Sequence, residues 1–260
     1  TGKTVSNEIE ALRAFCNWCV KRKYLREDPL AALAPFDTTP QTIRRAMTRD
    51  EVSRLLKVTP LERRLLYETT FLTGLRANEL RHLTLDHLDV ERGGLCLEAS
   101  WTKNRKAGFQ PLPTPLLRRL RDYGESGEPF RLYERAFRRG GSSRRPITGV
   151  LLYVPSHTAR SLYRDLAAAD IPRITPKGKV DFHGARVAFI NFLIENGDVT
   201  PKDVQELARH SSIDMSWNVY GRSSEERTRN AIENLSSIMK TDDESVPSVH
   251  REDTAPEREN

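Results

Sequence analysis

The stretch HGARVAFINFLIENGDVTPKDVQELARHSSIDMSWNVYGR, residues 183–222, combines amphipathic helix with four polar groups near its two ends. His183 and Arg186 stand three residues apart, a spacing that places both on one face of a helix. His210 follows a second helical pattern, and Tyr220 comes ten residues later. Each of these residues is common by itself at a protein surface or in packing, so their meaning depends on whether the fold brings them together.

Helical patterns dominate the chain on both sides of this stretch. Thr48 followed by Glu51 forms a capping box, which predicts a helix start. Gly74 is placed to end the helix that begins after Pro60. Apolar periodicity and end signals predict helices at about 4–25, 48–56, 60–74, from 77, 114–123, 158–169, 184–195, 202–209, 215–220 and 223–239.

One β-hairpin is expected at residues 95–113, where LCLEASW and FQPLP flank the polar turn TKNRKAG. Residues 124–156 are rich in Gly, Arg and Pro and show no clear period. Within them, the run RAFRRGGSSRR, residues 135–145, is interpreted as a mobile basic loop. The predicted fold class is therefore mostly α with a small antiparallel β-sheet.

Composition excludes several classes of protein. The 260 residues are 30% charged, and no run of about 18 apolar residues is long enough to span a membrane. The first ten residues lack the apolar core of a secretory signal. Cys16 and Cys19 fall on an apolar helix face, so we interpret them as packing residues rather than metal ligands. A reducing, cytoplasmic location is expected, in association with the nucleoid if the host is bacterial or archaeal.

The positive charge is concentrated in the body of the chain. The net charge is +6, but the last twenty residues carry seven acidic residues and two Arg. The other 40 basic and 29 acidic residues leave the body at +11. A basic body followed by an acidic tail indicates a domain that binds a polyanion and a disordered end.

Two further segments carry groups suited to an anion. In TGLRANEL, residues 73–80, Arg76 stands at a turn between two helices, and Glu79 lies one turn further on, where it can hold an Arg side chain. The tip of the predicted hairpin offers Lys103, Arg105 and Lys106, which could reach a phosphate. The ordinary interpretation is a surface ion pair and a solvated turn.

The order of these elements resembles the tyrosine recombinase (phage integrase) family. The resemblance consists of the Arg in TGLRANEL, a hairpin Lys followed by PLP, HxxR, RHSS and a Tyr ten residues on, and it covers about residues 48–240. One departure is Ala185, where the family usually has Leu. The resemblance implies the C-terminal part of a helical core-binding domain at 1–36, a linker at 37–47, a catalytic domain at 48–240 and an acidic disordered tail at 241–260.

The family mechanism, carried over to this chain, implies roles for the polar groups. Tyr220 would attack the scissile phosphate and form a 3′-phosphotyrosine, while Arg76 and Arg186 hold its non-bridging oxygens. Lys103 would protonate the leaving 5′-oxygen. These roles agree with elementary chemistry, since a phenol of pKa about 10 needs activation and a phosphoryl group in transit needs guanidinium partners.

The remaining roles are supporting ones. The resemblance makes His183 the base for the tyrosine, His210 a hydrogen-bond donor to the phosphate, and Glu79 the support of the first Arg. Arg105 and Lys106 are expected to bind DNA. No acidic cluster of the two-metal kind and no P-loop is present in the sequence, so neither a metal nor a cofactor is expected.

The expected function is site-specific recombination of double-stranded DNA through a Holliday junction, as in DNA integration by mobile genetic elements. The expected assembly is a homo-tetramer on two sites, or a monomer in isolation, with no membrane partner. Two alternatives remain open: a DNA-relaxing enzyme like the type IB topoisomerases, and a non-catalytic DNA-binding regulator on the same fold.

Overall fold

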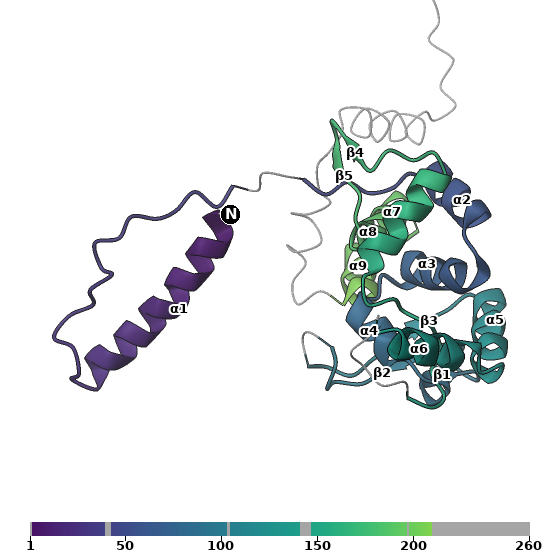
Figure 1. Cartoon of the computed structure of the whole chain (residues 1–260), viewed down its shortest axis with the longest axis horizontal. Coiled ribbons are helices and arrows are strands. Elements are labelled where there is room, and N and C mark those ends of the chain that lie inside the picture. The colour runs from purple at the N-terminus through teal and green to yellow at the C-terminus, as the bar shows by residue number, and fades with distance from the viewer. Residues whose placement is uncertain (1, 40–42, 103–104, 141–146, 197, 210–260) are drawn as a thin grey trace, which may run out of the picture.

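The computed structural model describes residues 2–39, 43–102, 105–140, 147–196 and 198–209 (Figure 1). The fold is mostly helical with small antiparallel sheets, as the sequence predicts. Its helices are α1 (Gly2–Lys21), α2 (Arg49–Val58), α3 (Leu61–Thr73), α4 (Ala77–His82), α5 (Thr114–Glu125), α6 (Glu128–Arg138), α7 (Thr158–Ala168), α8 (Gly184–Glu195) and α9 (Pro201–Ala208). The strands are β1 (Leu88–Asp89), β2 (Gly94–Leu97), β3 (Gly108–Pro111), β4 (Ile174–Thr175) and β5 (Gly178–Lys179). The predicted helices at 215–220 and 223–239 and the tail at 241–260 lie outside the described residues.

Helix α1 and the segment that follows it stand apart from the other helices (Figure 1). The helix ends at Lys21, earlier than predicted, because Lys23 adopts a left-handed conformation with φ 64° that reverses the chain. The returning segment is tied to the helix where Arg13 Nη2 donates a hydrogen bond to the Leu33 carbonyl at 2.8 Å. The large apolar residues Leu12, Phe15 and Trp18 of α1 remain exposed.

The start of α2 and the end of α3 follow the predicted signals. Thr48 Oγ1 accepts a hydrogen bond from the Glu51 amide at 3.2 Å, and the Glu51 carboxylate accepts one from the Thr48 amide at 2.9 Å. Gly74 ends α3 with φ 61°, a left-handed conformation that favours glycine. The turn at Gly74 sets the direction of the chain into α4.

The hydrophobic core lies where α3 packs against α8, with α2, α5 and α7 around this pair. Leu65, Leu66 and Phe71 of α3 are buried, as their periodicity predicts. The first half of α8 is buried on all sides, from Gly184 to Ile190. A helix surrounded in this way carries its polar groups into the interior, which is why Arg186 is buried.

The predicted hairpin forms from β2 and β3, which pair antiparallel with Leu95 opposite Gln110. Strand β1 adds to its other side and completes a three-stranded sheet in the order β1-β2-β3, which the sequence analysis did not anticipate. Leu95 and Leu97 face the core, and Gln110 is also buried. A buried glutamine needs hydrogen-bond partners, and one of them belongs to the site described below.

Two elements correct the sequence analysis. The interpretation of residues 135–145 as a mobile loop is wrong for 135–138, which form the end of α6. Helix α6 starts after Gly127, whose φ is 69°, and it is held in place by Tyr133, whose hydroxyl accepts a hydrogen bond from the Val154 amide at 2.9 Å. The short antiparallel pair β4-β5 was also not predicted.

The predicted linker is not wholly irregular. Residues 43–45 lie alongside β5, where the Lys179 amide donates to the Ile43 carbonyl at 2.8 Å and the Arg45 amide donates to the Lys179 carbonyl at 3.1 Å. The Arg44 side chain pairs with Asp181 at 2.7 Å, just before α8. This segment therefore reaches the edge of the candidate site. Within the described ranges, no helix is both long and apolar enough to cross a membrane.

Candidate active site

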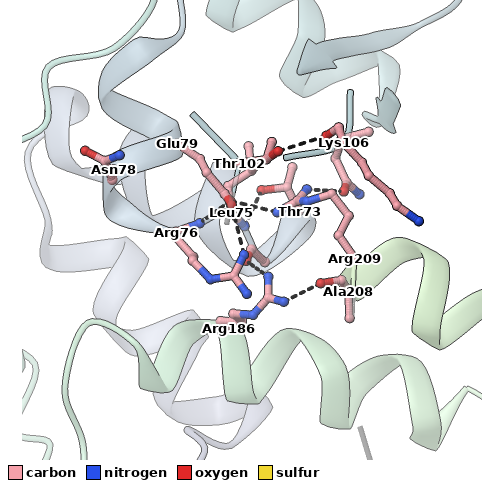
Figure 2. A network of polar contacts seen from close by, with 12 residues as sticks. Thr73, Leu75, Arg76, Asn78, Glu79, Thr102, Lys106, Arg186, Ala208 and Arg209 are labelled. Atoms are coloured by element: carbon pink, nitrogen blue, oxygen red, sulfur yellow. Dashed lines mark hydrogen bonds and ion pairs between the residues drawn. The ribbon is translucent and has the colours of Figure 1, made fainter. Parts of the chain in front are cut away.

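Arg76 stands at the N-terminus of α4, directly after the turn at Gly74. Its amide donates a hydrogen bond to Glu79 Oε2 at 2.8 Å, and its guanidinium Nη1 contacts Glu79 Oε1 at 2.9 Å (Figure 2). The Glu79 residue is only 1% exposed. The spacing of Arg76 and Glu79 predicts a contact between them, and the structure contains it. This contact holds the Arg76 side chain at the N-terminus of α4.

Arg186 enters the same region from α8. The residue is 2% exposed, and its guanidinium donates hydrogen bonds to the Gly74 carbonyl at 2.5 Å and to the Ala208 carbonyl (Figure 2). A buried charge is tolerated only where hydrogen bonds compensate its desolvation. Arg186 thus joins the end of α3 to the end of α9 and aligns these two segments with each other.

His183 precedes α8 and remains exposed at the edge of the site. Partial desolvation, together with the positive charges of Arg44 and Arg186, lowers the pKa of His183 below its ordinary value of 6.5, and the nearby Asp181 opposes this change only in part. The imidazole is therefore neutral at neutral pH. A neutral imidazole has a free nitrogen that can accept a proton.

These side chains meet in a pocket of about 200 Å³. It is lined by Leu75, Arg76, Ala77, Thr158, Phe182, His183 and Arg186. The pocket presents two guanidiniums, one imidazole and one hydroxyl, with no carboxylate among its lining residues. Such a set is suited to bind a tetrahedral anion, because paired guanidiniums make charge-assisted hydrogen bonds to its oxygens.

Two further residues near this pocket, Arg209 and Thr158, were not predicted from the sequence. Arg209 ends α9 with φ 50°, and its Nη2 pairs with Glu79 Oε2 at 2.8 Å while Nη1 donates to Gln110 Oε1 at 2.9 Å (Figure 2). Burial and the charge of Arg76 lower the pKa of Arg209, whereas Glu79 raises it. The only sequence signal was its place in RHSS, and nothing local indicates a partner 130 residues away.

The other predicted site residues are divided between the described part and the rest. Lys103, His210 and Tyr220 lie outside the described residues. Arg105 and Lys106 are exposed at the hairpin turn, which closes where Thr102 Oγ1 donates to the Lys106 carbonyl at 2.9 Å. In the part of the chain that the structure describes, no three His, Cys, Asp or Glu side chains form a group that could hold a metal ion.

Comparison with known proteins points to one family for the chain. The model of the phage integrase family matches residues 45–227. The tyrosine recombinase XerA of Thermococcus kodakarensis is 28% identical over 247 residues, which cover 92% of this chain and 78% of that protein. The tyrosine recombinase XerC of Halalkalibacterium halodurans is 24% identical over 235 residues, which cover 87% of this chain and 73% of that protein.

Solved structures share the fold at lower sequence identity. The structure of the Tn1549 transposon integrase with transposon right end DNA has a TM-score of 0.57 and 18% identity, covering 90% of this chain and 79% of that one. The crystal structure of XerA recombinase has a TM-score of 0.54, also at 18% identity, covering 83% of this chain and 70% of that one. At this identity the likeness extends to the fold alone.

Proposed function

The chain belongs to the phage integrase family, and we propose on that premise that it is a site-specific tyrosine recombinase that cuts and rejoins double-stranded DNA. The observation that carries the proposal is the convergence of Arg76, His183 and Arg186 on one pocket from α4 and α8. Two guanidiniums and a neutral imidazole around one cavity are the groups that a phosphodiester and an attacking phenol require. The XerA and XerC relatives, both named tyrosine recombinases, support the same conclusion.

In the proposed reaction the oxygen of Tyr220 attacks the scissile phosphorus, and the bond from phosphorus to the 5′-oxygen breaks. The phenol proton passes to His183, whose lowered pKa keeps it able to accept a proton at neutral pH. Lys103 supplies the proton that the leaving 5′-oxygen needs. The products are a 3′-phosphotyrosine and a free 5′-hydroxyl, and attack by a 5′-hydroxyl reverses the step and rejoins a strand.

Charge stabilisation falls to the two arginines. We assign Arg76 and Arg186 to the non-bridging oxygens, His210 to a further hydrogen bond with the phosphate, and Glu79 to the support of Arg76. Preorganised donors lower the barrier because they need no rearrangement when charge develops. The hydrogen bonds from Arg186 to two carbonyls hold its guanidinium in place before the reaction begins.

We further propose the larger assembly that this chemistry serves. Residues 1–36 would form part of a core-binding domain, 37–47 the linker, 48–240 the catalytic domain and 241–260 an acidic tail. Arg105 and Lys106, exposed at the hairpin turn, would contact phosphates of the duplex. Exchange of strands between two sites requires four active sites, which makes a homo-tetramer and a Holliday junction part of the proposal. The Tn1549 transposon integrase was solved in complex with transposon right end DNA, which supports DNA as the partner.

Covalent trapping tests the proposal. The protein is incubated with suicide duplexes nicked beside candidate crossover positions from its own genetic neighbourhood, and denaturing gels reveal any protein–DNA adduct. We expect an adduct that maps to a 3′-phosphate and disappears in Tyr220→Phe. Absence of an adduct with every duplex, despite tight DNA binding, would point to a non-catalytic regulator instead.

A second assay separates recombination from relaxation. Plasmids with one or two copies of the cleaved site are compared for recombinant products and for loss of supercoils. A recombinase needs two sites to exchange strands, whereas a topoisomerase relaxes either plasmid. Relaxation of both plasmids without recombinants would favour the relaxing enzyme.

A further inference from the structure

Arg209 combines a disfavoured backbone with a buried charge. In the described part of the chain, four residues other than glycine have positive φ: Lys23, Arg105, Asp170 and Arg209. The first three are exposed, whereas the Arg209 side chain is only 10% exposed. A left-handed conformation crowds Cβ against the backbone, and burial of a guanidinium is costly as well. A position that needed only a turn would be served better by glycine.

The side chain of Arg209 explains why both costs are tolerated. Its guanidinium reaches Glu79 at the start of α4 and Gln110 on β3, at 2.8 and 2.9 Å. It therefore joins the end of α9 to strand β3 and to the carboxylate that holds Arg76 (Figure 2). These segments lie far apart in the sequence, so the contact contributes to their alignment.

Glu79 is shared between two guanidiniums in a defined way. Its Oε1 accepts a hydrogen bond from the Arg76 side chain, whereas its Oε2 accepts hydrogen bonds from the Arg76 amide and from Arg209 Nη2. With Arg209 present, the three charges add up to one positive charge. Without it, Glu79 and Arg76 would form a neutral pair in which Glu79 is buried and Arg76 is partly exposed, and the field that Arg76 directs at an anion in the pocket would weaken.

We propose that Arg209 is a positioning residue that anchors Glu79, so that Arg76 stays oriented toward the phosphate in the pocket and the net charge of the three residues stays positive. The proposal rests on the proposed function and assigns Arg209 no contact with the phosphate itself. Its effect passes through Glu79 and Arg76. A purely structural role would instead act on the stability of the fold and leave the chemistry of folded molecules unchanged.

The test measures single-turnover cleavage of a saturating suicide duplex, DNA affinity and thermal stability for the full chain. The variants are Arg209→Ala, Arg209→Gly and Arg209→Lys. Lys202→Ala serves as the matched control, because Lys202 lies on α9 in an exposed pair with Glu206 and its loss removes the same charge. We expect Arg209→Ala to slow cleavage at least about tenfold, which corresponds to about 1.4 kcal/mol of barrier, with little change in DNA affinity.

Two comparisons isolate the mechanism. Arg209→Gly relieves the backbone but also loses the ion pair, so it should be more stable than Arg209→Ala and equally slow. Arg209→Lys keeps a charge near Glu79 and should recover part of the rate. In a Glu79→Gln background, the loss on Arg209→Ala should shrink, since the two residues act through one contact.

Several outcomes would overturn the inference. Wild-type cleavage rates in Arg209→Ala or in Arg209→Gly would show that the ion pair does not affect cleavage. If Arg209→Ala slows cleavage only as much as Lys202→Ala does, the effect comes from the net charge of the chain and not from the contact with Glu79. Loss of affinity alone would make Arg209 a DNA contact. If Arg209→Ala fails to fold, Arg209→Lys is the deciding variant. The proposal is contradicted if Arg209→Lys cleaves at the wild-type rate and adding Glu79→Gln does not change that rate.

The same experiment separates this inference from the proposed function. An adduct from the wild-type chain establishes cleavage, so that an unchanged Arg209→Ala rate then refutes only the inference. If the wild-type chain gives no adduct, the proposed function fails, and titration with inorganic phosphate followed by NMR decides the inference. Arg209→Ala should then bind phosphate at least about tenfold more weakly than Lys202→Ala, which corresponds to about 1.4 kcal/mol. Equal phosphate binding by the two variants would overturn the inference.

Discussion

Replacing Gly74 by alanine tests how tightly the turn between α3 and α4 is packed. Gly74 has φ 61°, and a Cβ there would lie 2.5 Å from Phe189 Cδ1 on α8. The left-handed conformation costs a residue with a Cβ about 1–2 kcal/mol. Forcing an extra methyl group into a packed core costs about 1–3 kcal/mol more. We therefore expect Gly74→Ala to lower the free energy of unfolding by about 2–5 kcal/mol.

Gly93 supplies the matched control, because its φ is 72° and a Cβ there would meet nothing within 4 Å. Gly93→Ala should cost only the backbone term, about 1–2 kcal/mol. Urea denaturation of the full chain, followed by circular dichroism, measures both. In a Phe189→Ala background, Gly74→Ala should cost no more than Gly93→Ala does. An equal loss for Gly74→Ala and Gly93→Ala in the wild-type background would refute the packing argument.

Two further predictions concern charged groups. Asp165 of α7 accepts hydrogen bonds from two residues of α3, from Arg63 Nε at 2.7 Å and from the Tyr67 hydroxyl at 2.8 Å. Asp165 and Tyr67 are buried, and Arg63 is half-buried. In urea denaturation Tyr67→Phe should cost about 0.5–1.5 kcal/mol, the usual contribution of one hydrogen bond. Asp165→Asn should cost about 1.5–3 kcal/mol, because it removes the carboxylate that pairs with Arg63 and leaves that guanidinium only its contact with Glu62. The reverse order would contradict this assignment. Arg44 lowers the pKa of His183, so Arg44→Gln should raise that pKa toward 6.5 and move the acid limb of the cleavage rate to higher pH. A pH–rate profile at low salt checks this shift, and a limb that stays in place or moves to lower pH would count against His183 as the base.

The elements that the sequence predicted well depend on contacts between near neighbours. The capping box at Thr48 involves a residue three positions on, and α2 starts where that signal lies. Gly74 ends α3 because its own backbone adopts the left-handed conformation. Local physics of this kind is visible in a single sequence, since the interacting atoms are brought together by the helix itself.

Three features could not be predicted in this way: helix α6, strand β1 and the β4-β5 pair. The stretch around α6 is rich in Gly, Pro and Arg, and its helix is held by distant contacts such as that of Tyr133 with Val154. Strands of two residues have too few positions to show an alternating pattern. Their existence depends on partners elsewhere in the chain, which override weak local preference.

The candidate site divides along the same line. The sequence by itself determined which residue types occur and in what order, because Arg76, the HxxR pair and the RHSS segment can all be recognised without a structure. Only the tertiary structure decided that Arg186 binds the Gly74 carbonyl 112 residues away and that Arg209 shares Glu79 with Arg76. Those contacts exist because α3 packs against α8 and α9 follows on, and the free energy that brings them together comes from burial of the whole core rather than from any one segment.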